Sequence, residues 1–444
     1  MQMPIETYQQ IEQYILETPK FAEKHTLEDT RRLFCRAVGS ELSSKVIHIA
    51  GTNGKGSVCA YLRSILMKSG CSVGVFTSPH LETMRERICL GEEIISEEDF
   101  IVTFYKVLRS WEDMTKDMNE EEKRRSHPSF FELLFLMAMV YFEEKKPEYI
   151  ILETGLGGRL DATNIVNRPV VSVITEIGFD HMQYLGNTIE EIAIEKAGII
   201  KPGVPVVFVD KRRKVTDILT QYAEKAKSQV YSIKKDSILD VNIHNKTIDF
   251  SFHSGYYIYD SLFLNTSALY QTENSSLAIT AAEVLSKSDS RIGPESIRNG
   301  LRAAYWPGRM EEVLPGVFLD GAHNEDGIEA FLKTVCADSC KGQRFLLFGV
   351  VADKQYEGMI KQIVKSEAFS QVAVTTLESD RSVSVDRLRE IWEQYNIHCS
   401  FHQNAEEAYH HLAKIVKEED VIYIAGSLYL IGQMKTLMRR ISDD

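Results

Sequence analysis

A glycine-rich segment near the start of the chain carries the residue types best suited to bind phosphate. Residues 51–57 (GTNGKGS) follow the apolar run Lys45–Ala50 and precede Val58–Lys68, which has helical character. Backbone N–H groups can approach a phosphate where no Cβ intervenes, and a helix N-terminus adds the positive end of its dipole. The Lys55 ammonium can reach nucleotide phosphates, and the Ser57 hydroxyl can reach a magnesium ion. We therefore expect an ATP-binding loop here.

This segment departs from the common P-loop pattern G-x-x-x-x-G-K-[ST]. Ile49 stands where the pattern has its first glycine, and Gly56 is inserted before the hydroxyl residue. A glycine-rich turn without a ligand is the alternative interpretation. The lysine, the hydroxyl and the position between a strand and a helix favour phosphate binding.

A second glycine-rich loop, Glu153–Asn164 (ETGLGGRLDATN), begins where the apolar run Tyr149–Glu153 ends. Open α/β sheets bind ligands at the carboxyl ends of their strands, where Glu153 is expected. A carboxylate there can hold a magnesium ion that bridges nucleotide phosphates. Arg159 and Asp161 add polar groups to the same loop. Taken alone, this pattern is also typical of an ordinary surface loop.

Two more residues, His181 and Lys196, become informative only in combination with these loops. A single histidine is more often structural than functional, and a lysine on a helix that ends near Gly198 ordinarily lies at the surface. Eight motifs nevertheless occur in one order between residue 48 and about residue 432: HIAGTNGKGS, TSPHL, ETGLGGRLDATN, DHMQYLG, EKAGIIKPG, WPGRME, LDGAHN and AGSLYLIG. Together they resemble the folylpolyglutamate synthase / dihydrofolate synthase family, a branch of the Mur-ligase superfamily. The resemblance covers nearly the whole chain, although Mur ligases in general share the P-loop and the lysine.

The resemblance implies an ATP site built from both halves of the chain. Asn274 matches a residue that contacts adenine, and two residues of the second domain match groups that close over the nucleotide. The implied ATP-binding residues are Gly51, Thr52, Asn53, Gly54, Lys55, Gly56, Ser57, Asn274, Arg309 and Asp320.

The resemblance also implies two magnesium ions beside ATP as co-substrate. Lys196 matches a lysine that is N-carboxylated, which meets a chemical need because an ammonium repels magnesium whereas a carbamate ligates it. The implied metal ligands are Ser57, Ser78, Glu153, His181 and Lys196 as its carbamate, and the implied catalytic residues are Lys55, His181, Lys196 and His323.

Folate and glutamate sites are implied in the same way. The folate segments match Phe131, Leu160, Asp161 and Ala162, and the region around Phe21 is a further candidate. His323 and Ser427 match the positions that bind the incoming glutamate. Ser427 has a second interpretation as the N-cap of the last helix.

Composition limits the class of protein. The chain has 444 residues, a net charge of −13, 44% hydrophobic and 26% charged residues, so two globular domains are expected and binding to nucleic acid or anionic membrane is not. The N-terminus lacks the apolar region of a signal peptide, and the most apolar stretch, Phe130–Phe142, is too short to span a bilayer. We read all seven cysteines as reduced thiols of a cytoplasmic, monomeric protein.

Apolar runs alternate with helical patterns, which predicts an α/β fold with a parallel sheet covered on both faces. Two alternating segments, Thr247–Phe252 and Tyr256–Phe263, predict a small antiparallel region attached to the first domain. A second, smaller Rossmann-like unit follows Trp306-Pro307-Gly308. The expected boundaries are an ATP-binding domain at 1–298, a linker at 299–308 and a glutamate-ligase domain at 309–444. The strands expected on either side of the linker are Lys45–Ala50, Ser72–Thr77, Tyr149–Glu153, Val170–Thr175, Val204–Val209, Val317–Asp320, Phe345–Val350, Val372–Thr376 and Val421–Ala425.

The parts together predict a ligase. ATP phosphorylates a carboxylate to an acyl phosphate, and the glutamate amine then displaces phosphate, with domain closure about the linker completing the site. Three ligases stay open: an enzyme that acts on dihydropteroate and extends folate tails, one that only extends tails, and another Mur-type ligase. Asp161 within GGRLDATN resembles the bacterial bifunctional form and so favours the first, while DATN, SPHL and the lack of a further domain before the P-loop speak against the third. An inactive binding protein is the alternative from a different class, and the competent residues at every phosphate and metal position speak against it.

Overall fold

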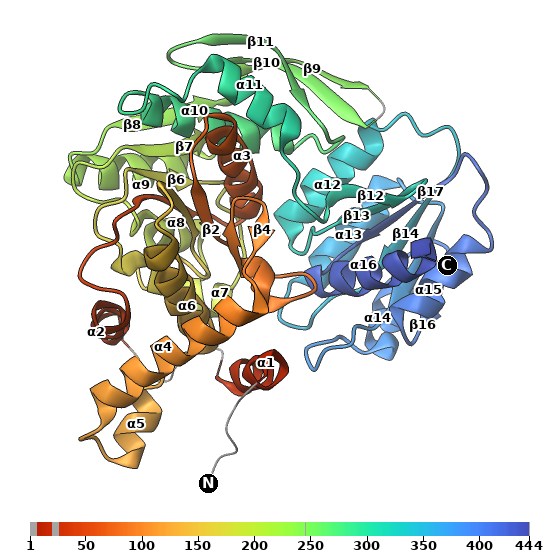
Figure 1. Ribbon diagram of the computed structural model, residues 1–444. Coiled ribbons are helices and arrows are strands. Elements are labelled where there is room, and N and C mark those ends of the chain that lie inside the picture. Colours follow the sequence, from red (N-terminus) through yellow and green to blue (C-terminus); the bar gives the residue numbers. More distant parts are fainter. Residues whose placement is uncertain (1–6, 20–25, 245, 444) are drawn as a thin grey trace. The chain divides into compact units, whose positions relative to one another are not determined.

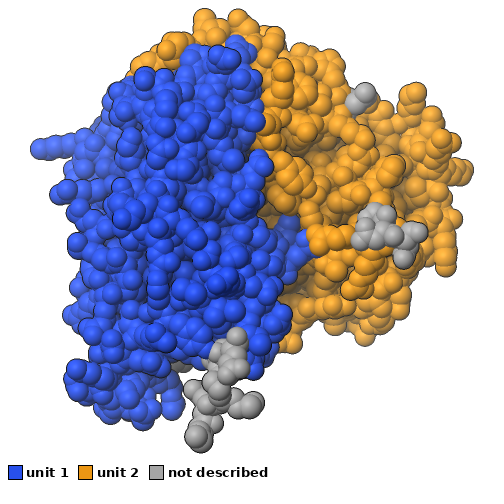
Figure 2. All heavy atoms as spheres, viewed as in Figure 1, with its two compact units in different colours: residues 1–177, 190–235, 277–300 blue, residues 178–189, 236–276, 301–444 orange. Residues whose placement is uncertain are grey.

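A computed structural model describes residues 7–19, 26–244 and 246–443 (Figure 1). Phe21 lies outside the described residues. The chain forms two compact units, drawn in blue and orange in Figure 2. Unit 1 comprises residues 1–177, 190–235 and 277–300, and unit 2 comprises residues 178–189, 236–276 and 301–444.

Unit 1 is built on an eight-stranded sheet with the order β4-β3-β2-β5-β1-β6-β7-β8. The five pairs that join β2, β5, β1, β6, β7 and β8 are parallel, and only the edge pairs β2–β3 and β3–β4 are antiparallel. A predominantly parallel sheet is therefore confirmed. The strands are β1 Lys45–Ala50, β2 Val73–Phe76, β3 Ile88–Leu90, β4 Glu93–Ile94, β5 Tyr149–Glu153, β6 Val171–Ile174, β7 Val206–Asp210 and β8 Val230–Lys234.

Helices cover this sheet and carry the loops at its strand ends. The helix after β1 begins at Lys55, three residues before the segment expected from the sequence. The α-helices that lie in or enter unit 1 are α1 Tyr8–Glu17, α2 Leu27–Ala37, α3 Lys55–Lys68, α4 Glu97–Thr115, α5 Glu120–Ser126, α6 Phe130–Lys145, α8 Ile189–Ala197, α9 Arg213–Lys225, α10 Gln271–Ser286 and α11 Pro294–Ala303. Short 3₁₀ turns occur at Met84–Arg87, Ala162–Ile165 and Lys235–Ser237.

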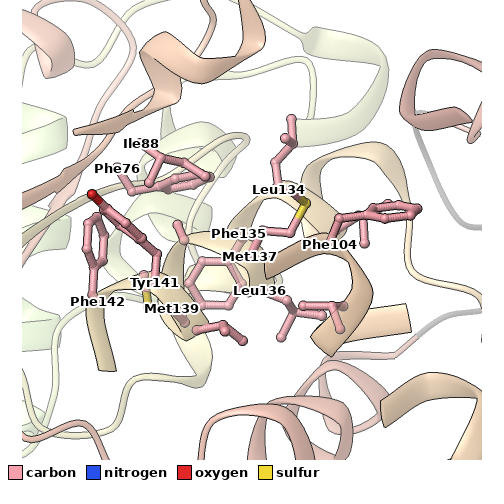
Figure 3. Close-up of a cluster of buried hydrophobic side chains, with 14 of the residues drawn as sticks. Phe76, Ile88, Phe104, Leu134, Phe135, Leu136, Met137, Met139, Tyr141 and Phe142 are labelled. Carbon is pink, nitrogen blue, oxygen red and sulfur yellow. The ribbon is translucent and has the colours of Figure 1, made fainter. Parts of the chain in front are cut away.

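Helix α6 forms the centre of a hydrophobic core in unit 1 (Figure 3). Ser129 caps it: its side chain accepts a hydrogen bond from the Glu132 backbone N–H, and its own backbone N–H donates to the Glu132 carboxylate. Every residue from Leu133 to Phe142 is buried, so this helix is apolar on all sides, as expected of a helix enclosed by protein. Among the described residues, no helix combines the length and apolarity needed to cross a membrane.

Unit 2 contains a three-stranded antiparallel sheet and a six-stranded sheet with the order β12-β13-β17-β14-β15-β16. The antiparallel pairing predicted for the region near residue 250 is confirmed, with β9 as an additional strand. In the larger sheet only the edge pair β12–β13 is antiparallel. The strands are β9 Ile238–His244, β10 Thr247–His253, β11 Ile258–Leu264, β12 Arg309–Leu314, β13 Val317–Asp320, β14 Arg344–Phe348, β15 Gln371–Thr375, β16 Cys399–His402 and β17 Val421–Ala425.

A second core lies around the six-stranded sheet, where Phe331, Phe348, Trp392 and Tyr423 are all fully buried. The helices of unit 2 are α7 Met182–Leu185, α12 Glu325–Ala337, α13 Tyr356–Ser366, α14 Val385–Trp392, α15 Ala405–Ala413 and α16 Leu428–Asp443. Contacts group residues 236–276 with unit 2, while the sequence placed the antiparallel region with the first domain. The domain boundaries at 1–298 and 309–444 stay a prediction. Each of the seven cysteines is a free thiol.

Candidate functional site

The glycine-rich loop 51–57 connects the carboxyl end of β1 to the start of α3. Gly54 precedes the helix with a φ of 89°, a left-handed conformation that suits glycine. Gly51 packs so closely against Thr175 that a Cβ would clash with its side chain. The Thr52 N–H donates to the Glu176 carbonyl at 2.8 Å, so the residues that follow β6 hold the loop in place.

Lys55 and Ser57 lie in the first turn of α3, at the end of this loop. The Lys55 ammonium donates to the carbonyl oxygens of Gly51 and Thr52, both at 3.2 Å, and lies 4.0 Å from the Glu153 carboxylate. Ser57 is buried in the first turn of α3. The loop, the cation and the helix N-terminus lie together, an arrangement that can bind phosphate.

Glu153 lies at the carboxyl end of β5, which pairs with both β1 and β2. Its side chain is buried and accepts a hydrogen bond from the Ser78 backbone N–H at 3.0 Å. Ser78 follows β2, so neighbouring parallel strands deliver the two residues to the same edge of the sheet. Glu153 therefore lies beside Lys55 at the strand ends, where open α/β sheets bind ligands.

Lys196 is the least ordinary lysine of unit 1. It is only 4% exposed, and its Nζ donates to the Gly51 carbonyl oxygen at 2.7 Å. A lysine on a helix usually lies at the surface, but Lys196 is buried. Gly158, in the loop after β5, packs closely against the same helix, because a Cβ there would clash with the backbone of α8 at Glu195. Lys196 therefore ties α8 directly to the phosphate loop.

The candidate folate residues lie on α6 and on the loop after β5. Phe131 is half-buried with its ring 5.6 Å from that of Phe76, Ala162 is buried, and Leu160 is 65% exposed. Asp161 is buried and accepts hydrogen bonds from the Leu156 N–H at 2.7 Å and from both the N–H and the hydroxyl of Thr163. Burial raises the pKa of Asp161 despite these donors.

His181 belongs to a cluster of polar side chains in unit 2. Asp180 is its centre, with the Lys354 ammonium at 2.5 Å, the Asn324 amide at 3.2 Å and the His323 Nε2 at 3.6 Å. His323 donates from Nδ1 to the Gly321 carbonyl, which leaves Nε2 directed at the carboxylate. The cluster thus unites two predicted residues, His181 and His323.

Burial opposes ionisation of Asp180, but the His323 imidazole and the Lys354 charge outweigh it and hold the pKa of Asp180 well below its usual range. His181 itself has a left-handed φ of 50° and lies between Asp180 and the short helix α7. Its backbone N–H donates to Asp180 at 2.8 Å.

The remaining predicted residues also lie in unit 2. Asp320 is buried at the end of β13, opposite Arg309 in β12, and accepts the Tyr270 hydroxyl at 2.5 Å. Burial raises the pKa of Asp320, while Arg309 and Tyr270 lower it. Asn274 is buried in α10 and donates to Gln271 at 3.0 Å. Ser427 accepts from the Tyr429 N–H at 3.2 Å, which confirms it as a cap of α16.

Three residues of these arrangements were not singled out from the sequence. Lys354 follows β14 in the stretch VADK, where it resembles any loop lysine. Asn324 and Tyr270 carry no local signal for contact with Asp180 or Asp320. The one available hint is that Asn324 directly follows His323 in LDGAHN.

Comparison with known proteins agrees with this arrangement of strands, loops and polar residues. The Mur ligase middle domain matches residues 49–282, and the Mur ligase glutamate ligase domain matches residues 308–428. The matches cover the phosphate loop, Lys196, the Asp180 cluster and Asp320. Fold and site therefore define a Mur-type ATP-dependent ligase.

Relatives narrow the assignment. The dihydrofolate synthase/folylpolyglutamate synthase of Bacillus subtilis is 33% identical over 97% of this chain and 99% of its own length. The Mycobacterium tuberculosis folylpolyglutamate synthase complexed with ADP superposes with a TM-score of 0.88 at 27% identity, covering 97% and 98% of the two chains. The Thermotoga maritima folylpolyglutamate synthase has a TM-score of 0.81 at 31% identity, covering 97% and 96%. The chain belongs to the folylpolyglutamate synthase / dihydrofolate synthase family.

Proposed function

We propose that this protein joins L-glutamate to folates at the expense of ATP, adding glutamate to dihydropteroate and extending the γ-glutamyl tail of tetrahydrofolate. The observation that carries the proposal is the phosphate loop with Glu153 and Lys196 at one sheet edge, in a chain similar along its full length to a dihydrofolate synthase/folylpolyglutamate synthase. A tail-extending enzyme alone is the second candidate, since a Lacticaseibacillus casei folylpolyglutamate synthase is 32% identical over 81% of this chain.

The reaction needs an activated carboxylate, because hydroxide is a poor leaving group. The γ-phosphoryl group of ATP passes to the substrate carboxylate and gives an acyl phosphate and ADP. The glutamate α-amine then attacks the acyl carbon, phosphate leaves and the amine loses a proton. Lys55 and the α3 N-terminus neutralise charge on the transferring group, so positioning and electrostatics carry most of the catalysis.

The residues of unit 1 fit a magnesium ion. Magnesium prefers oxygen ligands and keeps substrate phosphates and water among them. Glu153, Ser57 and Ser78 supply a buried carboxylate and two hydroxyls near the loop, and a carbamate on Lys196 would add two oxygens while keeping an N–H for the Gly51 carbonyl. Among the described residues, no group of three or more His, Cys, Asp and Glu side chains is arranged to hold a metal ion, so such an ion would depend on these mixed ligands. Magnesium would supply charge neutralisation on the ATP phosphates.

The other assignments keep their predicted roles within the proposal. His181 is proposed as a metal ligand, and Asn274, Arg309 and Asp320 as ATP-binding residues. His323 and Ser427 are proposed to bind glutamate, with His323 orienting the amine or accepting its proton. A cytoplasmic, monomeric protein with domains at 1–298 and 309–444 remains our prediction.

Phosphate release from ATP tests the function. Purified protein is mixed with ATP, magnesium and L-glutamate, together with either dihydropteroate or tetrahydrofolate, and a reaction without L-glutamate serves as the control. We expect glutamate-dependent release with both pterins. Release with tetrahydrofolate alone would leave only tail extension, and release with neither would refute the folate assignment.

A further inference from the structure

His48 is a buried polar residue that the proposed chemistry does not use. It lies in β1, three residues before Gly51, and is fully buried. In the parallel register it stands beside Leu152 of β5 and Ser172 of β6. Adjacent residues in register point to the same face of a sheet, and Leu152 belongs to the core that α6 fills. An imidazole at this position therefore requires a specific reason.

Its contact with Thr163 gives that reason. The His48 Nε2 lies 2.9 Å from the Thr163 hydroxyl, which lies 2.5 Å from the Asp161 carboxylate. A threonine hydroxyl has one proton, and the carboxylate can only accept, so that proton goes to Asp161. His48 must then donate from Nε2. His48, Thr163 and Asp161 thus form a chain of two hydrogen bonds from β1 to the loop after β5, which we call the relay.

The imidazole is neutral in this relay. Burial, with the nearby Lys201 charge, lowers the pKa of His48 to about 3, so the ring carries one proton, on Nε2. Within the described part of the chain, its buried Nδ1 has no hydrogen-bond partner. A donor on Nε2 and an unprotonated Nδ1 are consistent with each other, because an orphaned acceptor is less costly here than an orphaned N–H.

The two ends of the relay lie in different parts of the proposed site. β1 leads directly into the ATP loop, whereas Thr163 and Asp161 lie on the segment with the folate candidates Leu160 and Ala162. Asp161 also caps the short turn Ala162–Ile165 by accepting from the Thr163 N–H at 3.0 Å. Moving the Thr163 hydroxyl would therefore move the carboxylate and the turn together.

We infer that His48 is a positioning residue for the pterin substrate, acting through Thr163 to hold the Asp161 carboxylate and residues 160–162 in their binding geometry. This inference rests on the proposed folate activity. The relay supports the folate side of the site from the strand that carries the ATP loop, so its loss acts on pterin binding and leaves ATP binding in place.

Substitutions at Thr163 test the relay most directly. Thr163→Val keeps the shape and removes the hydroxyl, and Thr163→Ser keeps the hydroxyl. We expect Thr163→Val to raise the KM for dihydropteroate and for tetrahydrofolate by about tenfold, as loss of one hydrogen bond to a charged group does, and to change the KM for ATP by less than about twofold. Thr163→Ser should restore most of the wild-type pterin KM.

Substitutions at His48 provide a second, independent pair. His48→Leu removes the donor, and His48→Gln offers an amide N–H near the position of Nε2. We expect His48→Leu to raise the pterin KM while the ATP KM changes little. His48→Gln should restore part of the wild-type pterin KM. Ser172→Ala is the matched control. Ser172 lies beside His48 on the neighbouring strand β6, and its buried hydroxyl donates to the Ile199 carbonyl at 3.0 Å. Its loss therefore removes a buried hydrogen bond but leaves the relay intact.

The outcomes separate the relay from the function on which it rests. Wild-type protein that uses neither pterin overturns both the function and the inference. Wild-type activity with equal rises in pterin KM and ATP KM, or with no difference between Thr163→Val and Thr163→Ser, overturns the relay alone. A pterin KM that rises as much in Ser172→Ala as in Thr163→Val also overturns it, because general loosening of the core would then explain the effect.

Discussion

Two buried aspartates, one in each unit, are held in opposite ways. Asp161 in unit 1 accepts hydrogen bonds from two backbone N–H groups and a threonine hydroxyl, and its pKa is raised by burial. Asp180 in unit 2 faces Lys354 and His323, and its pKa is depressed although burial alone would raise it. Uncharged donors fix the position of a carboxylate, whereas a cation also fixes its charge.

The difference has consequences for each region. The three donors described for Asp161 are uncharged, so they fix the position of its carboxylate and not its charge. The ionic cluster around Asp180 is balanced within itself, so its members hold one another in a defined geometry. Removing a partner should therefore disturb geometry near Asp161 and leave an unbalanced charge near Asp180.

The largest effect is expected from removing the cation of the ionic cluster. Lys354→Met leaves the buried Asp180 without its ammonium, and we expect unfolding free energy to fall by about 3–5 kcal/mol. Urea denaturation of the purified variant measures this. Lys333→Met is the matched control, since its pair with Glu329 is exposed and is worth under about 1 kcal/mol. Equal losses in the two variants would contradict the ionic description of the cluster.

The next largest effect extends the comparison to Lys196, a buried lysine of unit 1. Lys196→Ala removes the Nζ that donates to the Gly51 carbonyl and the proposed carbamate, so we expect kcat to fall on the order of 10²–10³-fold. Steady-state phosphate release measures the rate, and circular dichroism verifies the fold. Lys214→Ala, at a lysine whose side chain is 76% exposed, serves as the control. Near-normal turnover in Lys196→Ala would show that the metal assignment is wrong.

A smaller effect is expected from substitutions at Asn324, the uncharged member of the cluster around Asp180. Asn324 caps α12 by accepting from the Gly327 N–H at 2.8 Å and also donates to Asp180. We expect Asn324→Ala to lower the unfolding free energy by about 1–2 kcal/mol, because the cap is lost. Asn324→Ser should restore the cap alone, and Asn324→Asp should restore it while placing a second carboxylate beside Asp180. A higher melting temperature for Asn324→Asp than for Asn324→Ser in thermal denaturation would contradict the contact with Asp180.

The smallest effect concerns Lys201, whose charge helps to lower the pKa of His48. Burial lowers the pKa of Lys201 from 10.5 to about 8 in the folded protein. Between these pH values the unfolded chain binds more protons than the folded chain, so stability contributed by this group rises with pH through that window. Because Lys201 is partly exposed, we expect a rise of about 1 kcal/mol that Lys201→Met lacks. Denaturation of both proteins at pH 7.5 and pH 10 measures the difference, and parallel curves would refute it.

Much of the fold was predictable because the signals are local. Buried runs of four to six apolar residues locate most strands to within one or two residues, as for β5 at Tyr149–Glu153 and β17 at Val421–Ala425. The edge strands β12 and β16 were not predicted. They are only partly buried and less apolar, so the pattern that identifies central strands is weak in them.

The chain by itself determined the phosphate loop, the strand-end carboxylate and the cap of the last helix. Each of these depends on neighbours within a few residues, where backbone geometry and residue type suffice to predict the arrangement. Tertiary structure alone decided which distant groups meet: Lys196 with the Gly51 carbonyl, Lys354 with Asp180, and His48 with Thr163. These partners lie more than 100 positions apart in the chain, and only the packing of strands and helices brings them within hydrogen-bonding distance.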